Sequence, residues 1–157
     1  METVMGKNTW GVYLSGEIHT DWRNDIILGC RDAKLDIEFY SPVTDHALSD
    51  DCGVEILGSE QEKFWHDNKG ARLNAIRTNA LIDKSDIVIV RFGDKYRQWN
   101  AAFDSGYAVA KGKSIITLHD ASLGHALKEI DSKAMAVAQS SEQVINILVY
   151  TLSGKLN

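Results

Sequence analysis

Apolar residues gather in five short segments along the chain, and these segments predict five β-strands. They cover residues 10–15, 37–40, 86–90, 114–118 and 134–139. The third segment, DIVIV, is almost entirely β-branched, which is typical of a strand that is buried on both faces. The pattern therefore indicates a parallel sheet with helices on either side.

Longer stretches between these segments carry apolar residues at helical spacing. They predict helices over residues 17–32, 68–84 and 100–111, and a last helix that opens at Ser140 and closes at Gly154. Because strands and helices alternate, and because crossovers between parallel strands are right-handed, we expect an α/β fold of the flavodoxin-like class. It would be a three-layer open sheet of five parallel strands in the order 2-1-3-4-5, with helices on both faces.

The segment from Val43 to Trp65 has no regular periodicity and is rich in acidic residues. A loop of this length in a compact domain is usually functional or mobile. We expect a solvated loop that forms a lid over the ligand pocket, in which Asp50 or Asp51 contacts the ligand. A cation site built around His46 and the acidic residues beside it is the alternative.

The expected strand order places a crevice at the carboxyl edge of the sheet, between the first and third strands. Residues 15–23 and 91–104 flank this crevice. Asp104 lies near the start of the helix that follows the third strand, where the helix dipole favours an ionised carboxylate, and Asn100 can share its face. Such a carboxylate suits a nucleophile or an anchor for sugar hydroxyls. A carboxylate that only stabilises the helix is the alternative.

His19 follows the first strand and has Glu17 and Asp21 nearby as carboxylate partners, which predicts an acid–base or ligand-contacting role. An ordinary solvent-facing or hydrogen-bonded histidine is the alternative. The sequence around His19 offers too few ligands for a metal ion, so we expect neither a metal nor another cofactor.

The loop over residues 91–99 combines aromatic side chains with hydrogen-bond donors, which suits a nucleobase or a nucleotide. Phe92, Tyr96 and Trp99 offer flat faces, although Phe92 and Trp99 would suit the core equally well. Arg77 falls within an apolar helical stripe and therefore needs a partner. That partner is either a ligand phosphate or carboxylate, or an acidic residue of a neighbouring element.

The segment AFDSGYAVAKGK, residues 102–113, resembles the nucleoside 2-deoxyribosyltransferase superfamily, whose corresponding helix carries a Phe-Glu-x-Gly-Tyr/Phe-Ala pattern and ends at Gly-Lys. The resemblance is closer to the YtoQ family, which is related to these transferases. The matching segments are residues 13–19 with Trp22 and Arg23, residues 74–78, residues 92–100 and residues 122–129. Together they cover most of the chain.

The resemblance implies roles for individual residues. The glutamate that serves as the nucleophile in the transferases aligns with Asp104, so this chain carries a carboxylate that is one methylene shorter. Tyr13 would orient it, and the leaving base would be protonated by Glu17, His19 or an aspartate of the lid. The residues that we expect to take part in catalysis are Asp104, Tyr13, Glu17 and His19. The residues that we expect to contact a ligand are Ser15, Gly16, Trp22, Arg23, Arg77, Phe92, Gly93, Tyr96, Trp99, Asn100 and His125.

Two hypotheses of function follow. The first is an N-glycosidic bond hydrolase or transferase that acts on a nucleoside or nucleotide through a carboxylate nucleophile. The second is a non-catalytic protein that binds a nucleotide or a nucleotide derivative, with Asp104 on the ribose hydroxyls. Flavin binding is disfavoured, because the residues after the first strand, GEIH, are not a phosphate-binding loop.

Composition and charge limit the classes of partner that we expect for this protein. The net charge of −5, from 17 basic and 22 acidic residues, argues against a nucleic-acid partner. No apolar run approaches the roughly 20 residues of a membrane helix. Cys30 and Cys52 lack a zinc-site spacing, and Met1 to Trp10 lacks the apolar segment of a signal peptide, so we expect a cytoplasmic protein with reduced thiols. We expect residues 1–157 to form a single domain, and the resemblance implies a homo-oligomer, a dimer or higher.

Overall fold

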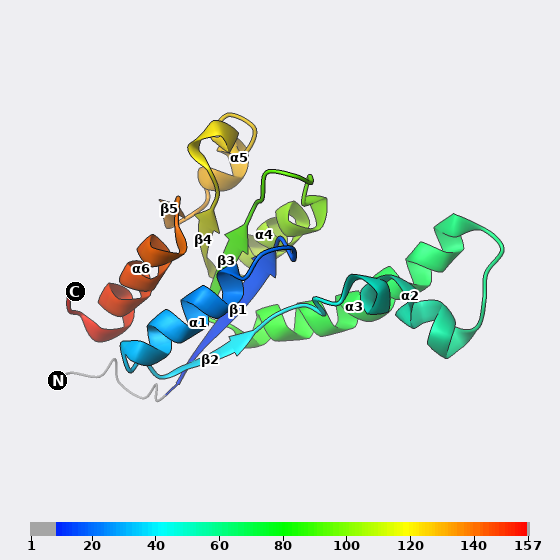
Figure 1. Ribbon diagram of the computed structural model, residues 1–157, viewed down its shortest axis with the longest axis horizontal. Coiled ribbons are helices and arrows are strands. Elements are labelled where there is room, and N and C mark those ends of the chain that lie inside the picture. The colour runs from blue at the N-terminus through cyan, green and yellow to red at the C-terminus, as the bar shows by residue number, and fades with distance from the viewer. Residues whose placement is uncertain (1–8, 157) are drawn as a thin grey trace.

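The computed structural model describes residues 9–156, so most of the N-terminal segment discussed above lies outside it. Five parallel strands form one sheet in the order β2-β1-β3-β4-β5 (Figure 1), which confirms the predicted flavodoxin-like topology. The strands are β1 (Trp10–Gly16), β2 (Ile37–Tyr40), β3 (Ile87–Arg91), β4 (Ser114–Leu118) and β5 (Ala136–Ala138). Each lies within one or two residues of the predicted span.

Helices cover both faces of the sheet, as the sequence predicts. Helices α1 (Trp22–Asp32) and α6 (Ser141–Ser153) pack on one face, together with Ile87 and Ile89 of β3. Helix α4 (Trp99–Ala110) and the end of α3 (Lys63–Lys84) pack on the other face, together with Val88 and Val90. The alternation along β3 explains its continuous apolar run, because successive side chains enter opposite cores. A 3₁₀ turn, η1 (Ala121–Leu123), and a short helix, α5 (Lys128–Asp131), follow β4.

The segment predicted as a lid loop is a helix, α2 (His46–Leu57), and that prediction is wrong. Asp45 caps the helix, because its Oδ1 accepts a hydrogen bond from the backbone N–H of Leu48 at 2.9 Å. The sequence pattern did not predict this helix because its main packing partner is α3 and not the sheet. Helix α3 also begins earlier than predicted, at Lys63.

The predicted core stripe of α3 is wrong for its middle part. Ile76, which was assigned to the stripe, is 69% exposed. Only the last turns of α3 reach the sheet, where Ile82 is buried, and the rest of the helix extends past the edge of the sheet beside α2 (Figure 1). We call α2 together with residues 63–78 of α3 the arm.

Two glycines let the helices of the arm approach each other closely. Gly53 of α2 lies against Gly70 of α3, and a Cβ added to Gly53 would lie 2.4 Å from the backbone nitrogen of Gly70. Asn74 adds a polar link, because its Nδ2 donates to the backbone oxygen of Ser49 at 2.9 Å and to Oγ of Ser49 at 3.1 Å. The arm is therefore joined by backbone proximity and hydrogen bonds more than by apolar burial.

The two cysteines are free thiols, Cys30 buried beneath the sheet and Cys52 half-buried in the arm. No helix within residues 9–156 is long and apolar enough to cross a membrane.

The substitution Gly53→Ala should destabilise the protein by about 1–3 kcal/mol, because the new methyl group overpacks a helix–helix contact that has no room for it. Thermal unfolding monitored by circular dichroism would show this as a lower Tm. The matched control is Gly106→Ala on α4, where an added Cβ meets no atom within 4 Å and where alanine favours the helix by roughly 0.5–1 kcal/mol. Equal Tm values for the two variants would contradict the close approach.

Candidate active site

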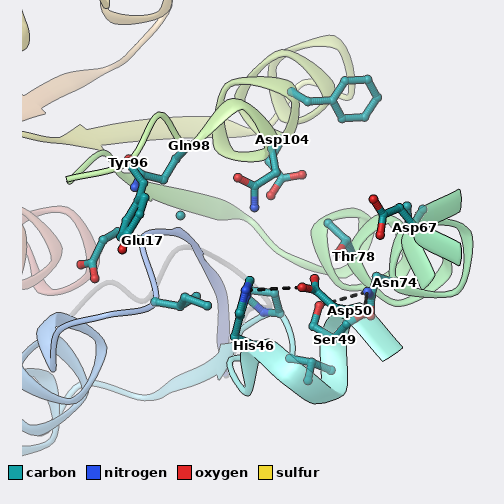
Figure 2. A pocket seen from close by; sticks show the side chains of 18 of the residues that line it. Glu17, His46, Ser49, Asp50, Asp67, Asn74, Thr78, Tyr96, Gln98 and Asp104 are labelled. Carbon is teal, nitrogen blue, oxygen red and sulfur yellow. Dashed lines mark hydrogen bonds and ion pairs between the residues drawn. The ribbon is translucent and has the colours of Figure 1, made fainter. Parts of the chain in front are cut away.

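A cavity of about 930 Å³ opens at the carboxyl edge of the sheet, at the place predicted from the strand order. Figure 2 shows its three sides: the turn after β1, the N-terminal half of α4 with the loop before it, and the arm. The carboxyl ends of β1 and β3 meet here because the two strands pair in register, with Ser15 opposite Val90. The parallel topology therefore brings together segments that are far apart in the sequence.

Asp104 projects into the cavity from the second turn of α4. The Ser15 hydroxyl, which is fully buried at the end of β1, donates to Oδ2 of Asp104 at 2.7 Å. Burial raises the pKa of Asp104 above its ordinary value of 3.8, and the hydrogen bond from Ser15 opposes that rise. The prediction that the helix dipole governs this carboxylate is wrong, because α4 begins at Trp99 and no acidic residue lies in its first turn.

Tyr13 lies beneath the same site and is fully buried. Its hydroxyl donates to Oγ1 of Thr78 at 3.5 Å and makes no hydrogen bond to Asp104. Burial, with a smaller contribution from the charge of Asp104, raises the pKa of Tyr13 to about 12, so the phenol stays neutral. Ser15, and not Tyr13, therefore makes the hydrogen bond that holds Asp104.

Glu17 lines the cavity at the turn after β1 and is only 5% exposed. Its carboxylate accepts hydrogen bonds from the backbone N–H of His19, from Oγ1 of Thr20 at 2.6 Å and from Nε of Arg91 at 3.1 Å. Burial by itself would raise the pKa of Glu17, but these hydrogen bonds together lower it below its ordinary value of 4.5. A carboxylate held ionised in this way shapes the turn and is a poor proton donor, which opposes the predicted acid role.

His19 and Tyr96 form an aromatic side of the cavity. Their ring centroids lie 4.8 Å apart with the planes tilted by 43°. The loop that carries Tyr96 is closed by Gln98, whose Oε1 accepts a hydrogen bond from the backbone N–H of Gly93 at 3.0 Å. Rings in this arrangement offer an apolar surface to a flat ligand.

The structure brings six of the predicted residues to the cavity wall. They are Gly16, Glu17, His19, Tyr96, Asn100 and Asp104. Their part in binding or catalysis stays a prediction.

Trp22 and Arg23 hold the turn after β1 instead of facing this cavity. The guanidinium of Arg23 donates to the backbone oxygens of Leu14, Gly16 and Glu17 at 3.1, 3.2 and 2.7 Å. Trp22 donates from Nε1 to the same Glu17 oxygen at 2.8 Å, and Arg23 stacks on its ring. Burial lowers the pKa of Arg23 to about 10. Helix α1 begins at Trp22, five residues later than predicted. It starts late because the side chains of Trp22 and Arg23 bind the backbone carbonyls of the turn after β1.

Five other predicted ligand contacts lie outside the cavity wall. Phe92 is 5% exposed and belongs to the core beneath α4, which is the alternative stated for it above. Gly93 packs against Glu17, because a Cβ there would lie 2.7 Å from Cγ of that residue. Trp99 is 74% exposed on α4, away from the cavity lining.

Arg77 and His125 complete this group. Arg77 is exposed on α3 and donates from Nη2 to the backbone oxygen of Ser41 at 3.4 Å, since the stripe that was expected to bury it faces solvent. His125 is exposed in the segment after η1. Asp120 caps η1, because its Oδ1 accepts a hydrogen bond from the backbone N–H of Ser122 at 2.9 Å.

The arm supplies three pairs of polar lining residues, and of these residues only Asp50 was expected from the sequence to contact the ligand. They share a spacing of four residues, which places both members of a pair on one helical face. The pairs are His46 with Asp50, Lys63 with Asp67, and Asn74 with Thr78. The spacing is visible in the sequence, but without the helix assignment of α2 it pointed to no common surface. Within residues 9–156, no group of three or more metal-ligating side chains is present.

Replacing Asp104 by asparagine should raise the Tm at pH 7. A folded-state pKa above the unfolded value of 3.8 means that the ionised carboxylate costs stability, and the cost grows as the pH rises through the folded pKa. Asparagine removes the charge and can still accept the Ser15 hydrogen bond. The gain should be about 2–4 °C for each 1 kcal/mol recovered. It should shrink toward zero as the pH falls below 3.8 to about pH 3, where the carboxyl is mostly neutral in both states. Thermal scans at the two pH values test this, and a lower Tm at pH 7 would refute the buried charge.

Comparisons with known proteins agree with this fold. A family model described as "Nucleoside 2-deoxyribosyltransferase YtoQ" matches residues 13–152. The protein YtoQ of Bacillus subtilis (strain 168) is 43% identical over 139 residues, which are 88% of this chain and 94% of that protein.

Solved structures share the fold at low sequence identity. A 2-deoxyribosyltransferase from Bacillus psychrosaccharolyticus matches with a TM-score of 0.52 and 16% identity, over 87% of this chain and 90% of that one. A conserved protein from Enterococcus faecalis V583 matches with a TM-score of 0.58 and 16% identity, over 87% and 95% of the two chains. The extent of the family match and the identity to its Bacillus subtilis member show that the chain belongs to the YtoQ family of nucleoside 2-deoxyribosyltransferase-like proteins.

Proposed function

We propose that this protein cleaves the N-glycosidic bond of a nucleoside, with Asp104 as the nucleophile, and passes the sugar to water or to a second base. The observation that carries the proposal is the state of Asp104: a carboxylate that is largely removed from water, held by one short hydrogen bond, and open to a cavity large enough for a nucleoside. A partly desolvated carboxylate with a single hydrogen bond retains free lone pairs for attack on carbon.

The reaction has two steps. In the first, an oxygen of Asp104 forms a bond to C1′ of the sugar, and the C1′–N bond breaks with its electron pair on the base, which takes up a proton. In the second, water or the nitrogen of an acceptor base attacks C1′, loses its proton, and releases the Asp104 carboxylate. Ser15 keeps one carboxylate oxygen engaged throughout, so the other oxygen is the one directed at the sugar.

The charges of the cavity favour a nucleoside over a nucleotide. Its wall carries four carboxylates and two cationic side chains: Glu17, Asp50, Asp67 and Asp104 against Lys63 and Arg97. Lys63 is already paired with Asp67 at 2.7 Å, which leaves Arg97 as the cation without a carboxylate partner among the lining residues. A 5′-phosphate with its charge of nearly −2 would meet net repulsion here.

Release of free base should be measured with a panel of ribonucleosides, 2′-deoxyribonucleosides and their 5′-monophosphates. We expect turnover of at least one nucleoside, with kcat/KM at least about tenfold above that of its 5′-phosphate because of the repulsion. Asp104→Ala should lower kcat by at least about 10³-fold, as expected for loss of a nucleophile.

The control for this assay is Asp25→Asn, which changes an exposed carboxylate on α1 and should leave turnover intact. Full activity in Asp104→Ala would refute the proposed nucleophile. No release from any compound, with a rise in Tm from one of them, would favour the non-catalytic binding protein instead. Neither release nor a rise in Tm would mean that nucleosides are the wrong class of ligand.

We also propose that the protein is a homo-oligomer in which a second copy covers the arm. Large apolar side chains of the arm face solvent, and Phe64 is 65% exposed and contacts Trp65 edge to face. The exposed set on the arm is Leu48, Ile56, Leu57, Phe64, Trp65 and Ile76. So many exposed apolar residues on one projecting unit are typical of a protein–protein contact.

Light scattering after size exclusion should give at least twice the mass of one chain. Phe64→Glu should shift the protein toward the monomer, because a charge buried in the contact is left without a partner. Met135→Glu is the matched control, since Met135 is equally exposed but lies just before β5, away from the arm. A monomeric wild-type protein, or equal masses for the two variants and the wild type, would contradict this assembly.

A further inference from the structure

A histidine–aspartate pair lies on the wall of the cavity that faces Asp104. His46 and Asp50 are one turn apart on α2, and Nε2 of His46 lies 3.4 Å from Oδ2 of Asp50. Both residues line the cavity, and Figure 2 shows them across from Asp104. Nδ1 of His46 makes no hydrogen bond to any residue in the range 9–156, so this nitrogen is open to a ligand.

Glycosidic chemistry at Asp104 requires a proton on the opposite side. A displacement at C1′ places the attacking carboxylate and the departing base on opposite faces of the sugar. A nucleobase is a poor leaving group as an anion, so a general acid beside it lowers the barrier. The acid must therefore stand on the wall across the cavity from Asp104, which is the wall formed by α2.

Most ionisable side chains of the cavity are unsuited to donate that proton. Glu17 is held ionised by three hydrogen bonds. Lys63 and Asp67 are committed to each other, and hydrogen bonds from Lys63 and His66 lower the pKa of Asp67. The guanidinium of Arg97 is unsuited because arginine side chains do not act as proton donors in proteins.

Two histidines remain, and only one has an oriented ring with a carboxylate partner. The ring of His19 stacks on Tyr96, and the nearby Glu17 carboxylate is engaged by the backbone of His19 and not by its imidazole. Nε2 of His46 lies within ion-pair distance of Asp50, and Nδ1 makes no hydrogen bond within residues 9–156, so Nδ1 can exchange a proton with a ligand. A carboxylate on one ring nitrogen that tunes the other is the arrangement by which histidine acts as acid and base in other enzymes.

We propose that His46 is the general acid and base of the reaction proposed above, on which this inference rests, and that Asp50 is its positioning residue. In the first step the imidazolium gives the Nδ1 proton to the departing base as the C1′–N bond breaks. In the second step the neutral imidazole takes the proton of the attacking water or acceptor base as the new bond to C1′ forms. The imidazolium is restored, so the proton count balances over one turnover.

Several charges act on this imidazole. Asp45 and Asp50 lie on or beside its own helix. From the other walls the cavity presents Asp67 and Lys63 of α3, Glu17 and His19 after β1, Arg97 of the loop before α4, and Asp104 of α4. Within residues 9–156, Asp50 is the one carboxylate within ion-pair distance of the ring, so it is the group that can hold the ring in one orientation.

The test compares two substrates that differ only in whether the base needs a proton. The guanine of 2′-deoxyguanosine leaves as an anion unless it is protonated. The base of 7-methyl-2′-deoxyguanosine carries a positive charge in the nucleoside and leaves as neutral 7-methylguanine. His46→Gln should lower kcat on 2′-deoxyguanosine by about 10²–10⁴-fold. On the methylated substrate kcat should fall less than about threefold. Asp50→Asn should show the same contrast between the two substrates, with a smaller loss in kcat and with KM unchanged.

The methylated substrate also serves as the control for folding, because a variant that turns it over at the wild-type rate has an intact site. Equal losses on both substrates, or no loss on either, would overturn the assignment of His46. Equal losses of kcat on both substrates in Asp50→Asn would overturn its positioning role. Wild-type protein that cleaves neither substrate, nor any nucleoside of the panel, would refute the proposed function itself and this inference with it.

Discussion

The hydrogen bond from Ser15 to Asp104 joins the end of a central strand to the helix that covers it, and the candidate site depends on this contact. The two residues are 89 positions apart in the sequence. They meet because β1 and β3 are neighbours in the sheet and the crossover after β3 carries α4 back over their carboxyl ends. The contact holds a carboxylate where burial disfavours its charge. Such a cost to stability is common where a group must react, and it marks Asp104 as more than a surface acid.

The sheet edge and the arm, which both border the cavity, are stabilised by different interactions. At the sheet edge, buried polar groups are fully satisfied: Arg23 binds three carbonyls, and Glu17 accepts from Thr20, Arg91 and a backbone amide. These networks fix the turn after β1 in one geometry. The arm has few apolar contacts with the core and instead relies on glycine proximity and exposed ion pairs. We therefore assign the rigid edge to the sugar and the attacking carboxylate, and the arm to the proton transfers and the contact with a second copy.

Sequence patterns located the sheet edge well and the arm poorly, for a physical reason. The strands are buried on both faces, so their β-branched runs are visible without knowledge of any partner. The same topology argument brought Gly16, His19 and Asp104 to one cavity. Helix α2 lacks that signal, because its stability comes from an N-cap and from a neighbour that is distant in the sequence. Arg23 and Phe92 look like ligand contacts in the sequence. In the structure Arg23 donates to backbone carbonyls and Phe92 packs in the core, and neither partner is visible in the sequence.

The central claim is that Asp104 forms a covalent bond to the sugar, and intact-protein mass spectrometry tests it most directly. The probe is a nucleoside fluorinated at C2′, because the fluorine slows the oxocarbenium-like step that releases the intermediate. Tryptic digestion then isolates residues 98–111, in which Asp104 is the only side-chain carboxylate. The account predicts a gain in mass equal to one fluorinated sugar, confined to that peptide and absent from Asp104→Ala. Release of base without any adduct, or an adduct on a different peptide, would contradict it.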